Sequence, residues 1–144
     1  YDNHIKRKYL AALHQIAESE KECSSKATVL HKDPLKSLSL SKEQVKVIVN
    51  YFYLKNGLEC AKESYYNFFG VYAAYAARHH SKIDTEMQSS SELVFTTFNL
   101  FHEAEAKYSL LPLELKQRLE KIDGLRNPIL PIETMEKLLR KSAK

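Results

Sequence analysis

Glycine and proline are scarce in this sequence, which has three glycines and four prolines among 144 residues. A β-sandwich needs turn residues about every 8 to 12 positions along the chain. So few of them argue against that class of fold. Alanine, leucine, glutamate and lysine, which favour helices, are frequent instead. We therefore predict an all-α protein.

Long apolar runs are absent as well. No run approaches the roughly 20 residues that span a bilayer, so the sequence predicts no transmembrane segment. No signal peptide is visible, but the chain begins at Tyr1 and not at methionine. We expect either that a secretory signal has been removed or that Tyr1 is an arbitrary boundary, and both readings stay open.

Cysteine occurs only at Cys23 and Cys60, without the CxxC spacing of a redox dithiol or a cysteine-rich zinc site. The remaining alternatives are two free thiols or one disulfide. If the first predicted helix packs antiparallel on the second, and the chain turns at Asn56-Gly57, Cys60 comes close to Cys23. We therefore predict a Cys23–Cys60 disulfide. It would place the protein in the periplasm or outside the cell, whereas free thiols would indicate the cytoplasm.

Charge is only mildly biased, with 22 basic and 18 acidic residues and a net charge of +4. Much of the excess lies near the two ends of the chain. The residues concerned are Lys6, Arg7, Lys8, Lys137, Arg140, Lys141 and Lys144. Basic and aromatic residues are not interleaved as a single-strand binding groove requires. Nucleic-acid binding by a cytosolic regulator is therefore the alternative function and not the favoured one.

Apolar residues recur at helical spacing in several segments. The predicted helices are 4–21 (an extension to 31 is left open), 41–55, 58–80, 92–108, 112–122 and one that begins at 131. The sequence "SKEQ" at Ser41 has the pattern of a capping box with Gln44. No repeat or linker divides the chain. We predict one domain, 1–144, folded as a compact bundle of about five helices with one disulfide.

Two boundaries and one helix face are also predicted. Asn56-Gly57 should end the helix 41–55, because glycine commonly follows a helix C-terminus. Ser90 or Ser91 should cap the helix 92–108, after a polar loop. The inward face of that helix should be formed by Leu93, Leu100, Phe101, Ala104 and Tyr108, with Val94 and Phe98 beside it.

Tyrosine is abundant, and six of the nine tyrosines lie between residues 51 and 77. Helical spacing predicts that Tyr9, Tyr65 and Tyr72 belong to the core. Three other tyrosines lie off the apolar stripes and are better placed to contact a partner, as are two histidines of the following loop. The predicted partner-binding residues are Tyr51, Tyr66, Tyr75, His79 and His80.

Residues that could support catalysis or metal binding form no known pattern. His102 and Glu105 share a helical face, but the Glu-x-x-His pairs of a di-metal bundle are missing. No glycine-rich phosphate loop or nucleophile turn is found. The sequence predicts no metal, no cofactor and no enzyme. It predicts a binding module for another protein, such as an inhibitor, an immunity-type protein or an accessory subunit.

Overall fold

Helices make up most of the computed structural model, which describes residues 2–30, 33–79 and 85–139. The six longer helices are α1 (Asp2–Ser25), α3 (Lys42–Cys60), α4 (Lys62–His79), α5 (Thr85–Ser109), α6 (Leu113–Leu119) and α7 (Pro131–Leu139). A one-turn helix, α2 (Asp33–Lys36), and a 3-10 helix, η1 (Asp123–Arg126), are shorter. The all-α prediction is confirmed. The predicted count of about five is wrong, because six longer helices are present, one for each of the six segments with helical spacing.

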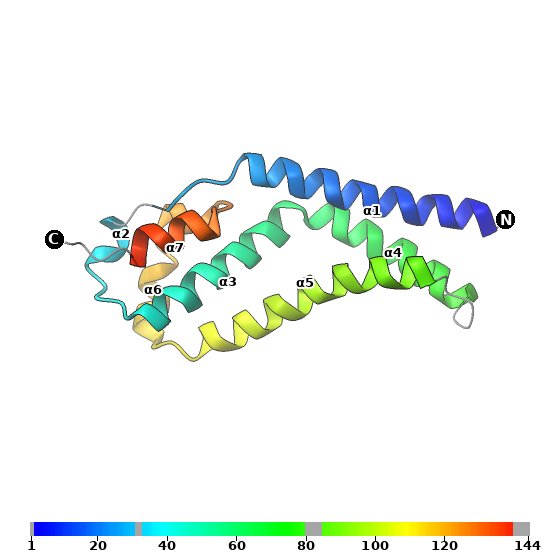
Figure 1. Ribbon diagram of the computed structural model, residues 1–144. Helices are drawn as coiled ribbons and strands as arrows, with labels where there is room; N and C mark the ends of the chain where they lie inside the picture. The colour runs from blue at the N-terminus through cyan, green and yellow to red at the C-terminus, as the bar shows by residue number, and fades with distance from the viewer. Residues whose placement is uncertain (1, 31–32, 80–84, 140–144) are drawn as a thin grey trace.

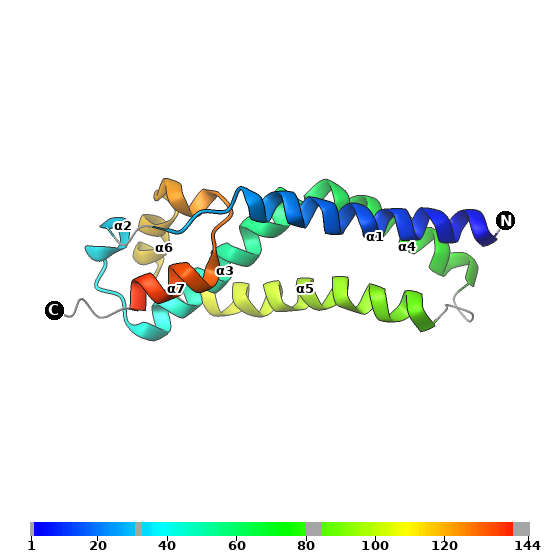
Figure 2. The same ribbon diagram turned by 45° about the horizontal axis from the view of Figure 1, so that its top comes forward.

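The helices are arranged along one long axis (Figure 1). Helices α3 and α4 follow each other nearly end to end, and α1 lies along α4. Helix α5 runs back beside both (Figure 2), while α2, α6 and α7 gather at the α3 end. None of the described helices is both long enough and apolar enough to cross a membrane.

Helix α3 begins as its sequence predicts. The Ser41 hydroxyl oxygen accepts a hydrogen bond from the Gln44 amide at 3.1 Å, and the Gln44 side-chain oxygen accepts from the Ser41 amide at 3.0 Å. This pair is the predicted capping box, which satisfies two amides that have no partner inside the helix. The buried residues of α3 include Val45, Ile48, Val49 and Phe52.

Helix α3 does not end at Asn56-Gly57, contrary to the prediction. It continues to Cys60, and the change of direction falls at Ala61, with φ −99° and ψ 15°. Gly57 has no positive φ. The buried Asn56 amide donates to the carbonyl oxygens of Leu125 at 2.6 Å and Asn127 at 3.0 Å. Asn56 therefore bonds to a distant segment and does not form a turn.

Helix α5 also begins earlier than predicted, at Thr85. The prediction that Ser90 or Ser91 caps it is wrong, since both lie inside the helix. Ser91 is buried, and its hydroxyl is hydrogen-bonded to the hydroxyl of Tyr9 on α1. A serine within a helix can serve a tertiary contact as well as a cap, and sequence alone does not separate the two uses.

The buried residues form two cores that meet where α3 joins α4. The α1–α4 core comprises Tyr9, Ala12, Ile16, Cys23, Ala61, Tyr65, Phe68, Tyr75 and Val94. The α3–α7 core comprises Leu30, Leu35, Val45, Ile48, Val49, Phe52, Tyr108, Leu119, Leu125 and Ile129. Helix α5 supplies residues to both and holds the two halves of the bundle together.

Aromatic rings fill much of the space between α5 and its neighbours. The rings of Tyr51 and Tyr108 stack at 4.0 Å, and those of Phe69 and Phe98 meet at 5.1 Å. Core positions are confirmed for Tyr9 and Tyr65, whereas Tyr72 is partly buried. The aromatic residues of the stretch 51–77 are therefore mostly buried or partly buried, with Tyr53 and Tyr66 as the exposed ones.

The predicted inward face of α5 is wrong at two positions. Leu93 is 73% exposed and Leu100 is 49% exposed. Ala104 and Tyr108 are buried as predicted, and Val94 beside them is buried too. The rotation of α5 about its own axis is set by the packing of its aromatic rings. The spacing of apolar residues alone does not specify this rotation.

Candidate functional site

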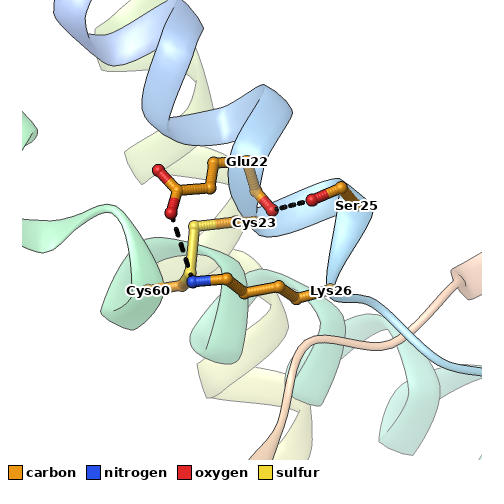
Figure 3. Close-up of polar contacts among 5 residues, drawn as sticks. All are labelled: Glu22, Cys23, Ser25, Lys26 and Cys60. Carbon is orange, nitrogen blue, oxygen red and sulfur yellow. Dashed lines mark hydrogen bonds and ion pairs between the residues drawn. A yellow bond between two sulfur atoms is a disulfide. The ribbon is translucent and has the colours of Figure 1, made fainter.

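The predicted disulfide between Cys23 and Cys60 is present, with 6.1 Å between the two Cα atoms (Figure 3). Cys23 is buried near the end of α1, and Cys60 is the exposed last residue of α3. Glu22 and Lys26 form an ion pair at 3.3 Å on either side of Cys23 in the sequence. The bond therefore ties the end of α1 to the junction of α3 and α4.

The disulfide forms for a different reason than the sequence suggested. Helix α1 packs chiefly on α4, antiparallel to it, and to a smaller extent on α3. The hydroxyls of Ser19 and Ser64 are 2.5 Å apart. One turn further along, the Asn67 amide donates to the Gln15 side-chain oxygen at 3.1 Å. Cys23 lies one turn beyond Ser19 on α1, and Cys60 lies about one turn before Ser64, at the end of α3. The two cysteines are therefore opposite each other in the same antiparallel register, because α3 continues to Cys60.

A groove of about 310 Å³ lies beside the disulfide. Five parts of the chain line it: the end of α1, the second half of α3, the start of α4, the middle of α5 and the segment 128–129. Its lining residues are Glu20, Cys23, Ser24, Ala27, Tyr53, Leu54, Gly57, Leu58, Tyr65, Thr97, Pro128 and Ile129. Its volume is at the lower end of the range for ligand sites.

One carboxylate marks the groove. An oxygen of Glu20 accepts a hydrogen bond of 2.5 Å from the hydroxyl of Tyr65. Burial, and next this bond, raise the pKa of Tyr65 well above its usual value, so the phenol stays a donor at neutral pH. The second oxygen of Glu20 has no bonding partner within the described ranges. Neither lysine, arginine nor histidine is among the described residues that line the groove.

Gly57 keeps part of the groove open. A Cβ atom built on Gly57 would meet nothing within 4 Å. Because its backbone is helical and its φ is not positive, a side chain here would project into open space without strain. Gly57 was predicted to end a helix, and its place in the groove was missed.

The exposed leucines of α5 lie next to the groove. Leu93 is four residues before Thr97 and Leu100 is three residues after it, so all three share one side of the helix. Thr97 lines the groove. We call the groove together with Leu93 and Leu100 the groove surface. Tyr53, which is 41% exposed, lies within it.

A second hollow, of about 460 Å³, lies against α3, between it and the α6–η1 region. It is lined by two basic side chains, Lys55 and Arg126, and by two acidic ones, Glu59 and Glu120. These charges offset one another. The hollow therefore has no preference for a ligand of either sign.

The sequence-predicted partner-binding residues do not form one surface. Tyr66 is 66% exposed, Tyr51 is partly buried in its stack with Tyr108, and Tyr75 is only 8% exposed, against Tyr9. The expectation that Tyr75 is exposed is wrong, because it packs between α1 and α4. His79 is the last residue of α4, and His80 lies outside the described residues.

The polar residues considered for chemistry are likewise dispersed. His102 Nδ1 lies 3.8 Å from Glu105 Oε1 on the exposed side of α5. No three histidine, cysteine or acidic side chains of the described ranges are grouped to hold a metal. The basic residues at the start of α1 and Lys137 on α7 lie toward opposite ends of the bundle (Figure 1). They do not form one basic patch.

No protein-family model, curated protein or solved structure matches this chain. The groove surface is therefore interpreted from its own geometry. Its residues were missed by sequence reasoning because they come from five separate segments. The one signal that could have pointed to it is the disulfide, which was predicted and which forms its edge.

Proposed function

We propose that this protein is a non-catalytic, exported helical binding module that binds another protein through the groove surface. The observation that carries this proposal is the pair of exposed leucines, Leu93 and Leu100, beside the groove that Thr97 lines. Exposed apolar side chains gathered around a hollow are typical of protein-binding surfaces. Isolated exposed leucines would carry no such meaning.

The make-up of the groove surface supports the same proposal. Tyrosine is enriched at interfaces because its ring is apolar while its hydroxyl can still form hydrogen bonds. Tyr53 supplies such a ring in the groove, and the leucines supply apolar area beside it. An inhibitor, an immunity-type protein or an accessory subunit would present a surface of this kind on a rigid scaffold.

Export is supported by the disulfide. Such bonds persist in oxidising compartments and are rare in a reducing cytosol. Cys60 is exposed, so a reducing environment would have access to the bond. We therefore propose the periplasm or the extracellular space as its location.

Site-specific photocrosslinking in the producing cells tests the binding surface. A benzophenone amino acid replaces Leu93 or Leu100 in turn, and Leu110, which is 84% exposed near the end of α5, serves as the matched control. We expect one discrete adduct from positions 93 and 100 and none from position 110. Equal adducts from all three positions, or none from positions 93 and 100, would contradict the proposal.

A further inference from the structure

The charge of the groove defines what it can bind. Glu20 is the one charged side chain among the described residues that line it, although the protein as a whole carries a net charge of +4. One oxygen of this carboxylate accepts from Tyr65, and the other has no partner in the described ranges. Because Glu20 is exposed, a ligand that enters the groove meets a carboxylate oxygen open to solvent and no competing cation among the described lining residues.

The aromatic residues of the groove also favour a cationic ligand. Tyr53, which is 41% exposed, lines the groove together with Glu20, whereas Tyr65 is only 3% exposed and contributes the hydroxyl that bonds to Glu20. Aromatic faces attract cations, and a planar guanidinium both stacks on rings and forms strong hydrogen bonds to a carboxylate. An ammonium can use the carboxylate but stacks less well. The combination of one carboxylate and one exposed tyrosine ring favours a guanidinium.

We propose that the groove binds the guanidinium of an arginine side chain on a partner protein, with Glu20 as its acceptor and Tyr53 as its stacking ring. This inference rests on the proposed function and specifies the chemistry of the partner. The groove opens at a surface where Leu93 and Leu100 are exposed. A partner protein can cover these leucines while it inserts one side chain, whereas a free amine leaves them in water.

The amide signals of the three glycines in the chain report where a ligand binds. Glycine amides resonate apart from most others in a ¹⁵N–¹H correlation spectrum. Gly57 lines the groove, Gly70 lies on the exposed side of α4, and Gly124 lies against Leu30. A ligand in the groove should therefore shift the Gly57 signal and leave the other two in place.

The titration uses the capped tripeptide Ala-Arg-Ala, its neutral citrulline analogue and the diamine putrescine. We expect saturable movement of Gly57 with the arginine peptide and at least roughly tenfold weaker binding of the citrulline peptide, since a charge-assisted hydrogen bond is lost. The Glu20→Gln variant should weaken arginine-peptide binding by a similar factor. Glu22→Gln removes the same charge from the same helix outside the groove, and it should bind like the native protein.

The outcomes separate this inference from the proposed function. Equal binding of the arginine and citrulline peptides would overturn the cation specificity while leaving a binding groove in place. Tighter binding of putrescine than of the arginine peptide would indicate that the groove binds free amines. It would contradict the proposal that an arginine side chain of a partner protein binds there. No movement of Gly57 with any of the three would contradict both the inference and the use of this groove in binding.

Discussion

Single polar side chains determine how the segments of this protein meet. Asn56 lies on α3 and donates both hydrogens of its amide to backbone carbonyls that follow η1 or lie within it. Tyr65 joins α4 to α1 through its bond to Glu20. Each of these contacts links residues far apart in the sequence. Their loss should therefore affect the whole fold more than the loss of a polar contact within one helix.

Replacement of Asn56 by alanine should lower the free energy of unfolding by about 2–3 kcal/mol, because buried carbonyl groups lose their donor. Urea denaturation followed by circular dichroism measures the change. Asn50 lies on the exposed side of the same helix, so Asn50→Ala is the matched control and should cost much less. Equal losses for the two variants would show that the Asn56 bonds contribute nothing specific.

Stability should fall above pH 10, in part because of Tyr65. Burial and the bond to Glu20 raise its pKa above the ordinary value of 10.0, so the folded protein keeps a phenol proton that the unfolded chain releases. The unfolded state then binds fewer protons, and the free energy of unfolding decreases as the pH rises above 10. In Tyr65→Phe this decrease should be shallower by up to about 1.4 kcal/mol per pH unit. Urea titrations from pH 8 to 11 would contradict this if the two proteins gave parallel profiles.

The lengths and pairings of the helices were only partly predictable from sequence. The capping box at Ser41 depends on four neighbouring residues, and it was predicted correctly. The continuation of α3 through Gly57 depends on the bonds of Asn56 to residues about 70 positions away. The local preference for a turn at Asn-Gly contributes little free energy compared with such contacts. The same holds for α5, whose rotation is set by rings that pack on α3 and α4.

The helical state of Gly57 leads to a direct test. Gly57→Ala and Gly70→Ala should each raise the free energy of unfolding by about 0.5–1 kcal/mol, since alanine favours helices over glycine and neither new methyl group meets an atom within 4 Å. Thermal and urea unfolding of both variants measure this. Destabilisation by Gly57→Ala alone would indicate a turn at that position.

The molecule as a whole consists of two cores joined by α5 and by the α3–α4 junction, with the disulfide at that junction. The fold class and the disulfide were predicted from composition, periodicity and the two cysteines. The groove surface was not, because its lining exists only once α1, α3, α4, α5 and the segment 128–129 come together. Leu93 and Leu100 have core-like spacing, and only the packed structure shows that they face outward.

Reduction of the disulfide should lower the free energy of unfolding by about 4 kcal/mol, the chain-entropy value for a cross-link between residues 37 apart. Urea denaturation of the oxidised protein and of the same protein kept reduced with a phosphine gives the difference without changing the sequence. A difference below about 1 kcal/mol would mean that the helix packing alone fixes the junction.

The most direct test of the groove as the partner site is to fill it. Gly57→Leu places a side chain in the open space of the groove, and Gly70→Leu makes the same change on α4, where a Cβ also meets nothing within 4 Å. Both are combined with the photocrosslinker at position 93. We predict that Gly57→Leu abolishes the partner adduct while Gly70→Leu preserves it, with both variants folded by circular dichroism. An adduct that survives Gly57→Leu at full yield would show that the partner does not use the groove.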